Sequence, residues 1–354
     1  MNRFWSEGLK TLQPYVPGEQ PKNRSVIKLN TNENPYPPSP KALAAARNAA
    51  DADLRLYPDP DASDLKAAIA RHHGVAVENV FAGNGSDEVL AVAFLAFFRN
   101  TLPVAFPDIT YSFYPVYCAL FGVPFATFPI TGDWRIDLTR VPRENGGVLF
   151  PNPNAPTGCF TPVTEIEALL QRNTGTAVLV DEAYVDFGGE SAIPLTPKYP
   201  NLLVTQTFSK SRSLAGLRVG FAVGDAGLIT GMEAVKNSFN SYTMDRLAIA
   251  GAAAAMEDKE YFEQCRAAII NTRETAAREL AALGFEVLPS KANFVFARHP
   301  RLGGQELYDA LRAKNILVRY WNKPGLSDFL RITIGTDREM AALAAALKEI
   351  LAGV

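Results

Sequence analysis

Near its middle the chain reads Val178-Leu179-Val180-Asp181-Glu182-Ala183-Tyr184, an apolar run that ends in two acids and a tyrosine. A strand that is buried on both faces reads as an unbroken apolar run. In parallel sheets the carboxyl ends of the strands face ligands. The stretch therefore predicts a central parallel strand with a candidate site at its end, although acids at such a position also cap ordinary turns.

Short apolar runs of the same kind recur on both sides of this stretch and alternate with segments of helical spacing. The apolar runs lie at residues 80–82, 103–106, 147–150 and 202–205, and the helical segments at 40–50, 62–73 and 87–98. Strands that alternate with helices build a mainly parallel sheet with helices on both faces. The expected fold class is therefore α/β.

A chain of 354 residues exceeds what one hydrophobic core usually serves, so two domains are expected. Residues 1–35, rich in Pro and Asn, are expected to form an extended arm. We expect a large site-bearing domain over residues 36–245 and a smaller α+β domain over residues 246–354, which the arm joins. The smaller domain is indicated by strand-like residues 292–297, 316–320 and 329–334 around a helix at 305–314.

Composition narrows the classes of partner. The 35 Lys and Arg nearly balance the 37 Asp and Glu. The net charge therefore gives no electrostatic attraction to nucleic acid or to an anionic membrane. The sequence has no apolar run long enough to span a bilayer, no export signal and no metal-ligand spacing. Its three scattered cysteines suit a reducing compartment. We expect small-molecule partners, a cytoplasmic location and no metal site.

A second polar strand end is found at Thr207-Phe208-Ser209-Lys210. A lysine acts as a nucleophile only in its neutral form, which burial or a neighbouring cation favours. Lys210 is therefore a candidate nucleophile if it is buried. A Ser-Lys pair on a solvated surface loop is the ordinary alternative.

Several residues near these strand ends suit a phosphorylated, flat ligand. Ser209 and Arg218 supply a hydroxyl and a planar guanidinium, which both bind phosphate well. Ser86 and Asp87 open a helix after a glycine-rich turn, so their backbone N–H groups face any anion there, although both are also ordinary helix caps. Tyr111 is a candidate for stacking on a flat ring, with core packing as the alternative.

The ordered set of motifs resembles the fold-type-I pyridoxal-phosphate aminotransferases. The set comprises Asn-Pro-Asn-Ala-Pro-Thr-Gly at 152–158, Asp-Glu-Ala-Tyr at 181–184, Ser-Lys at 209–210 and Leu-Ala-Gly-Leu-Arg at 214–218. Within that class the chain is most similar to the histidinol-phosphate aminotransferase family, through the stretches at 12–18, 28–35, 57–60 and 330–335. The resemblance covers essentially the whole chain.

The resemblance implies pyridoxal 5′-phosphate as the cofactor. Lys210 matches the lysine that holds it as a Schiff base and later shuttles a proton, and Asp181 matches the acid that pairs with the pyridine nitrogen. Tyr184 matches the residue that hydrogen-bonds the ring's phenolic oxygen, and Tyr111 the residue that stacks on the ring. Asn154 is a weaker match for a second contact to that oxygen, because the usual asparagine position holds Ala155.

The resemblance also implies a phosphate cup and a shared site. Ser209, Arg218 and the backbone of Ser86 and Asp87 match the cup. Tyr57 matches a tyrosine that reaches the same phosphate from the neighbouring subunit, which implies a homodimer.

For substrates the resemblance implies histidinol phosphate and the pair glutamate and 2-oxoglutarate, in histidine biosynthesis. Arg331, Arg319 and Tyr15 match the residues that would meet the substrate anions. For Arg319 a surface ion pair or aromatic stacking is the alternative. Three rival functions stay open at this point, namely an aromatic amino-acid aminotransferase, a lyase similar to threonine-phosphate decarboxylase, and a binding protein without catalysis.

Overall fold

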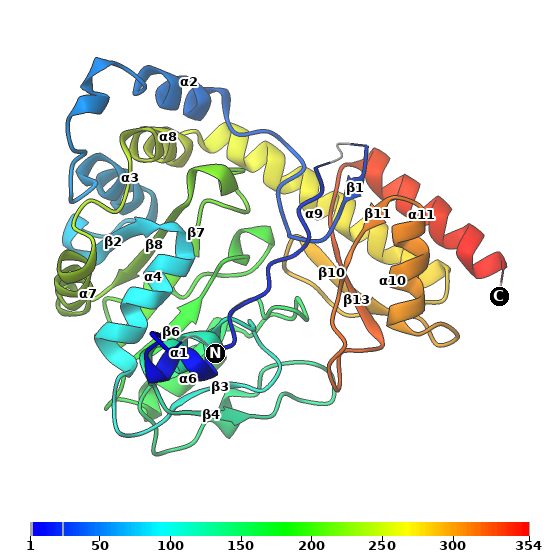
Figure 1. Ribbon diagram of the computed structural model, residues 1–354, viewed down its shortest axis with the longest axis horizontal. Helices are drawn as coiled ribbons and strands as arrows, with labels where there is room; N and C mark the ends of the chain where they lie inside the picture. Colours follow the sequence, from blue (N-terminus) through cyan, green and yellow to red (C-terminus); the bar gives the residue numbers. More distant parts are fainter. Residues whose placement is uncertain (1–2, 23–24, 354) are drawn as a thin grey trace.

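The computed structural model describes residues 3–22 and 25–353 and contains two parts, each built on its own sheet (Figure 1). The long helix α9 (Lys259–Ala282) runs from the larger part to the smaller one. No helix in the described part of the chain combines the length and the apolar run that crossing a bilayer requires.

The larger part is built on a seven-stranded sheet. Its spatial order is β2 (Val80–Asn84), β8 (Val219–Gly224), β7 (Leu202–Thr207), β6 (Val178–Asp181), β5 (Val148–Pro151), β3 (Val104–Pro107) and β4 (Phe125–Phe128). Only β8 runs antiparallel to its neighbours in this sheet. The expected α/β class with a mainly parallel sheet is confirmed.

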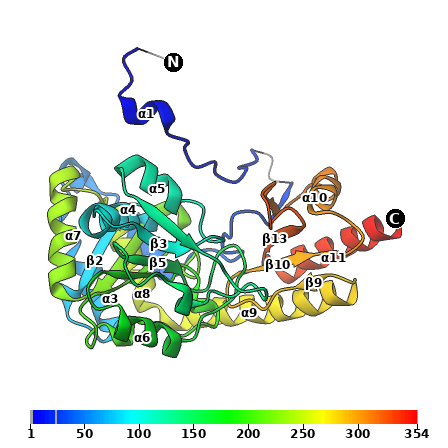
Figure 2. The same cartoon turned by 90° about the horizontal axis from the view of Figure 1, so that it is seen from below.

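Helices cover both faces of this sheet (Figure 2). One face carries α3 (Ser63–His73), α6 (Val163–Arg172) and α8 (Arg246–Glu257), and the other carries α4 (Gly85–Ala93), α5 (Tyr114–Phe121) and α7 (Ala226–Phe239). Successive strand residues point to opposite faces, so Val178 and Val180 join the first core and Leu179 joins the second. This double burial explains why the strands are apolar at every position.

The smaller part is an antiparallel sheet covered by helices. The strands follow the order β12 (Arg319–Tyr320), β13 (Phe329–Thr333), β10 (Phe294–Arg298) and β9 (Glu286–Val287), and α9, α10 (Gly304–Ala313) and α11 (Asp337–Ala352) contribute to the packing. The arm adds a strand to this part, because β1 (Ile27–Lys28) pairs in parallel with β11 (Ile316–Leu317). Before β1 the arm carries the short helix α1 (Glu7–Thr11).

The position of α8 bears on where the smaller domain begins. Ala248, Ile249 and Ala252 of α8 are buried in the core of the seven-stranded sheet. The helix also packs against α2 (Pro40–Asn48) and α3. The domain limits expected from the sequence stay a prediction, and we propose moving the boundary at residue 246 to the start of α9.

Candidate functional site

The carboxyl ends of β5, β6 and β7 meet at one edge of the large sheet. The parallel register sets Pro151 beside Asp181 and Asp181 beside Thr205. The turn that carries Lys210 follows β7 directly. The sheet geometry therefore brings the two polar strand ends that the sequence singled out to the same edge.

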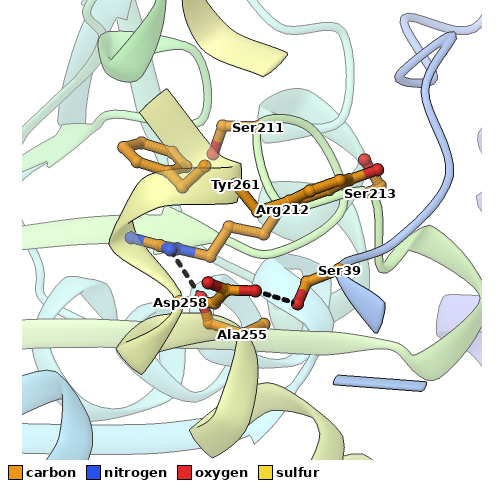
Figure 3. Close-up of a pocket in the computed structure, with 8 residues that line it drawn as sticks. Ser39, Ser211, Arg212, Ser213, Ala255, Asp258 and Tyr261 are labelled. Atoms are coloured by element: carbon orange, nitrogen blue, oxygen red, sulfur yellow. Dashed lines mark hydrogen bonds between the residues drawn. The ribbon is translucent and has the colours of Figure 1, made fainter. Parts of the chain in front are cut away.

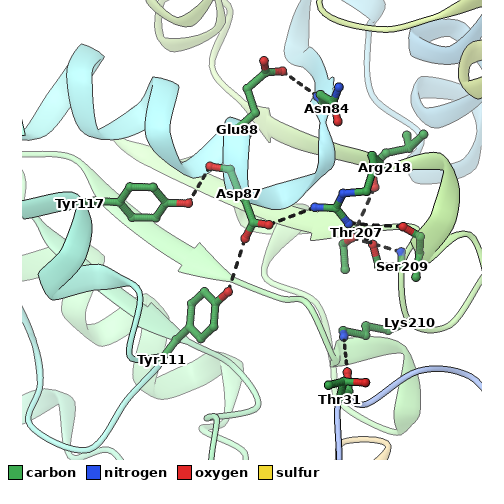
Figure 4. Close-up of polar contacts among 12 residues, drawn as sticks. Thr31, Asn84, Asp87, Glu88, Tyr111, Tyr117, Thr207, Ser209, Lys210 and Arg218 are labelled. Atoms are coloured by element: carbon green, nitrogen blue, oxygen red, sulfur yellow. Dashed lines mark hydrogen bonds and ion pairs between the residues drawn. The ribbon is translucent and has the colours of Figure 1, made fainter. Parts of the chain in front are cut away.

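Lys210 lies in a site closed by the N-terminal arm. Its Nζ donates to the Thr31 carbonyl oxygen at 3.1 Å (Figure 4). The same atom lies 5.9 Å from the ring centre of Tyr184. Burial, and then the positive charge of Arg331, lower the pKa of Lys210 to about 8. The side chain therefore has the partly neutral amine that a nucleophile needs.

Asp181 is a buried acid at the end of β6, and it is 4% exposed. Burial raises the pKa of its carboxyl to about 6. Tyr114 Oη donates to Asp181 Oδ2 at 2.9 Å, and the Ala183 N–H donates to Oδ1 at 3.3 Å. Because these contacts favour the ionised form against burial, the carboxylate is held ready for a cationic partner. Sequence reasoning missed Tyr114, whose only signal was a polar ring in the apolar helix α5.

Arg218 lies between Asp87 and Ser209 (Figure 4). Its Nη2 donates to Asp87 Oδ2 at 3.0 Å, and its Nη1 donates to Ser209 Oγ at 3.4 Å. Gly85 makes room for the guanidinium, since a Cβ there would lie 2.5 Å from Arg218 Nη2. The structure thus gathers a guanidinium, a hydroxyl and the amino end of α4, where first-turn N–H groups lack intrahelical partners.

The other residues expected to contact a flat ligand ring lie around this edge of the sheet. Tyr184 packs its ring against Phe294 at 5.1 Å, and burial raises the pKa of its phenol. Tyr111 Oη donates to Asp87 Oδ1 at 3.4 Å. Asn154 is fully buried and donates to the Ile109 carbonyl at 3.1 Å, while its Oδ1 has no partner among the described residues. A buried amide oxygen of this kind has room to accept one more hydrogen bond.

The arm contributes residues that sequence reasoning did not assign. Asn34 Nδ2 donates to the carbonyls of Lys210 and Ser211, at 2.9 and 3.2 Å, and so ties the lysine turn to the arm. Asn32 Nδ2 donates to Tyr184 Oη at 2.9 Å. The asparagine-rich stretch was visible in the sequence, but these contacts join residues far apart in the chain and have no local signal.

Two arginines face each other across β12 and β13. Arg319 is the register partner of Arg331, and both guanidinium groups lie over the Trp321 ring, at 5.3 and 5.1 Å. Both also bond to the arm, with Arg331 Nη2 donating to the Asn30 carbonyl at 3.1 Å and Arg319 Nη2 donating to the Val16 carbonyl at 3.3 Å. Like charges directly opposite destabilise a sheet, so this pair is suited to bind an anion between its members.

Tyr15 and Tyr57 differ in their surroundings. Tyr15 stacks on Phe113 at 4.8 Å, lies 6.3 Å from the Tyr111 ring and interacts electrostatically with Arg331. Tyr57 is 78% exposed and stacks on Tyr242 at 4.5 Å. None of its contacts among the described residues reaches Lys210 or Arg218, so the structure does not bring Tyr57 to the site of its own chain.

A small cavity of about 10 Å³ lies on another side of the lysine turn (Figure 3). It is lined by Ser39, Ser211, Arg212, Ser213, Ala255, Asp258, Tyr261 and Phe262. Its polar groups already pair with one another, as Ser39 Oγ does with Asp258 Oδ2 at 2.5 Å and Arg212 Nη1 does with the Ala255 carbonyl at 2.8 Å. We read it as a packing feature. Over residues 3–22 and 25–353 no side-chain cluster suited to a metal ion is found.

Comparison with known proteins gives concordant matches. Residues 24–347 match the family described as aminotransferase class I and II. The chain is 60% identical over 353 residues to histidinol-phosphate aminotransferase 1 of Methylococcus capsulatus, covering 100% of this chain and 99% of that protein. It is 58% identical to histidinol-phosphate aminotransferase 1 of Pseudomonas aeruginosa, covering 98% and 99%.

A solved structure is also similar over the full length. The histidinol-phosphate aminotransferase of Sinorhizobium meliloti, in complex with pyridoxal-5′-phosphate, superposes with a TM-score of 0.88 at 28% identity. The match covers 100% of this chain and 99% of that chain.

Proposed function

The chain belongs to the class I and II aminotransferases and, within them, to the histidinol-phosphate aminotransferase family, and from this premise we propose a role for each residue of its site. It is a pyridoxal-phosphate-dependent aminotransferase of histidine biosynthesis. It transfers the amino group of L-histidinol phosphate to 2-oxoglutarate and gives imidazole acetol phosphate and L-glutamate. The observation that carries the assignment to this site is the half-buried Lys210, with its pKa near 8, at the same sheet edge as the buried Asp181.

The residues of the site fit pyridoxal 5′-phosphate. Asp181, a buried carboxylate, suits the pyridine nitrogen in its protonated form. The unpartnered Asn154 Oδ1 and the Tyr184 hydroxyl offer an acceptor and a donor to the polar groups of the ring. Arg218, Ser209 and the amino end of α4 suit the phosphate.

When bound, the cofactor supplies an aldehyde for amine exchange and a ring that accepts electrons from the substrate Cα. Lys210 would provide the amine that holds the cofactor and, as a free amine, would accept the proton from the substrate Cα and donate it to the cofactor's C4′. Asp181 holds the proton on the pyridine nitrogen. Tyr184 donates to the ring's phenolic oxygen, and Tyr111 packs on the ring face.

We propose that Arg331, Arg319 and Tyr15 bind the anionic groups of both substrates. The pair of arginines offers parallel donors to a carboxylate or a phosphate. One pocket would then serve glutamate in one half-reaction and histidinol phosphate in the other.

The function is tested by adding L-histidinol phosphate to the purified, cofactor-loaded protein. We expect the visible absorbance of the lysine-linked cofactor to bleach and 2-oxoglutarate to restore it with turnover. Comparing rates on phenylalanine separates the aromatic aminotransferase alternative, and carbon dioxide release without a keto acid would identify a decarboxylase. Absence of both the spectral change and 2-oxoglutarate-dependent turnover would refute the assignment.

Cofactor attachment should depend on pH through Lys210. Only the neutral amine attacks an aldehyde, and an ordinary lysine has a pKa of about 10.4. With the pKa at about 8, the attachment rate to the cofactor-free protein should rise with pH and level off above about pH 8. Stopped-flow absorbance measures this rate, with Nα-acetyl-lysine as the control amine. A rate that keeps rising to pH 10 would contradict the lowered pKa.

The two arginines of the pair are expected to contribute differently to the binding of the two substrates. Arg331→Gln is expected to raise KM for both glutamate and histidinol phosphate by about 10- to 100-fold, because each loses a charge-assisted hydrogen bond. Arg319→Gln should raise KM more for histidinol phosphate, since a phosphate has more oxygens to satisfy than a carboxylate. Steady-state kinetics on both substrates measures this. Arg298→Gln, at an exposed ion pair with Glu286, is the control, and equal effects of all three variants would count against the assignment.

We propose a homodimer in which Tyr57 reaches the phosphate of the neighbouring subunit. The support is its exposed ring, which stacks on the exposed Tyr242 and follows the exposed Leu54 and Leu56 in the chain. Tyr57→Phe keeps the ring and removes one hydroxyl, so cofactor affinity should fall about tenfold while the dimer persists. Equilibrium dialysis and sedimentation velocity measure the two, with Tyr242→Phe as control. A monomer, or unchanged affinity in Tyr57→Phe, would contradict the proposal.

We also propose a cytoplasmic location. Cys118, Cys159 and Cys265 are all free and buried, as expected for a protein that stays in a reducing compartment.

A further inference from the structure

Asn32 of the arm lies between Tyr184 and the sheet of the smaller part, and it is 1% exposed. Its Nδ2 donates to Tyr184 Oη at 2.9 Å. Its backbone N–H donates to Thr333 Oγ1 at 3.0 Å, and its Oδ1 accepts from the same hydroxyl at 3.0 Å. Asn293 Nδ2 donates to the Asn32 carbonyl at 2.9 Å. All four polar groups of Asn32 are therefore paired.

The backbone of Asn32 adopts a left-handed conformation, with φ of 57°. Among residues other than glycine, asparagine tolerates this region well. The residue thus supplies both the backbone turn that brings the arm to the site and the amide that reaches Tyr184.

Thr333 fixes which way the Asn32 amide faces. A hydroxyl has a single proton, and Thr333 Oγ1 already accepts the Asn32 N–H, so its own proton must go to another acceptor. Within the described part of the chain, the acceptor found for it is Asn32 Oδ1. If the amide were flipped, two donors would face the Thr333 oxygen and the buried hydroxyl proton would lose its acceptor. The amide nitrogen therefore faces Tyr184.

The direction of this hydrogen bond decides what Tyr184 can do. Since Tyr184 accepts from Asn32, its own phenolic proton stays available to donate to a third group. Burial raises the pKa of the phenol, which keeps that proton in place at neutral pH. In the proposed function the third group is the phenolic oxygen of the cofactor ring.

We propose that Asn32 and Thr333 are positioning residues that turn the Tyr184 proton toward the cofactor. The inference rests on the proposed role of Tyr184. Because Asn32 belongs to the arm and Thr333 to β13, this proton is directed only when the arm and the smaller part are both seated against the large sheet. Cofactor binding is thereby linked to the closed arrangement of the chain.

The test is a double-mutant cycle on cofactor affinity, measured by equilibrium dialysis of protein prepared without cofactor. Tyr184→Phe should weaken binding about tenfold, the effect of one hydrogen bond. Asn32→Asp should weaken it by a similar factor, because aspartate only accepts and would draw the Tyr184 proton to itself. In the Tyr184→Phe background the same Asn32→Asp change should cost less than about twofold.

Two further variants exclude an effect of added charge. Thr333→Val removes the hydroxyl without adding charge and should again weaken binding only while Tyr184 is present, whereas Thr333→Ser keeps the hydroxyl and should bind normally. Melting temperatures identify variants that are merely unfolded. Equal losses for Asn32→Asp and Thr333→Val with and without Tyr184 would overturn this inference alone. Unchanged affinity in Tyr184→Phe would overturn the proposed role of Tyr184 and this inference with it.

Discussion

Replacing Lys210 with alanine is expected to stop steady-state amino transfer from L-histidinol phosphate to 2-oxoglutarate. The variant loses both covalent attachment of the cofactor and the group that moves the Cα proton, and general acid-base catalysis alone contributes about 10²- to 10⁴-fold. The cofactor should still bind, because Arg218, Ser209 and Asp181 remain. Turnover should therefore fall at least by that factor, measured as glutamate formation, while dialysis still detects bound cofactor.

The control is Lys236→Ala, since Lys236 is a lysine with little exposure, at 3% exposed, whose Nζ bonds to Glu233 and to the Pro60 carbonyl. That variant should lose thermal stability and keep its turnover. Small primary amines added to Lys210→Ala should restore part of the rate, because they can move a proton in place of the missing side chain. A Lys210→Ala enzyme that retains more than about a tenth of the activity would contradict the assignment.

The fold was predictable wherever a strand is buried on both faces. The predicted runs at 178–180 and 202–205 correspond to β6 and β7, because each apolar side chain of these strands fills one of the two cores on either side of the sheet. The strand β4 was missed, since it lies at the sheet edge and Phe125 is 47% exposed. Strand β9 has only two residues and carries too little pattern to be seen.

The site was predictable where chemistry follows a strand end. Lys210 and Asp181 stand out in the sequence because polar residues interrupt an apolar run, and the sheet register then brings the two ends together. Tyr114, Asn32 and Thr333 give no such signal, because their importance arises from hydrogen bonds across 67 to 301 residues of sequence. Sequence patterns report local periodicity, whereas these partners are set by how the arm and the two sheets pack.

Replacing Asp181 with asparagine is expected to lower kcat by about 10²- to 10³-fold, the effect of losing one preorganised charge in a water-poor site. Asparagine keeps the size of the side chain and can still accept from Tyr114, so the fold should persist. What is lost is the negative charge that holds a proton on the pyridine nitrogen.

In the native enzyme the negative charge of Asp181 disappears as the pH falls through the pKa of its carboxyl. That pKa is about 6 without a cationic partner and lower with one. The acid limb of the kcat profile should therefore lie below about pH 6 and be absent from Asp181→Asn.

Glu182 provides a sharp control, because it is the adjacent acid and is buried to a similar degree, at 2% exposed. Burial raises its pKa to about 7, but its carboxylate accepts from Ser191, the Ala192 N–H and Gln206, at 2.6, 2.6 and 2.9 Å. Glu182→Gln should thus alter the melting temperature and leave kcat within about threefold. If both variants lost the same activity, the loss would reflect removal of a buried charge in general. A loss of activity confined to Asp181→Asn would show that the Asp181 carboxylate is the acid that supports the electron-accepting ring of the cofactor.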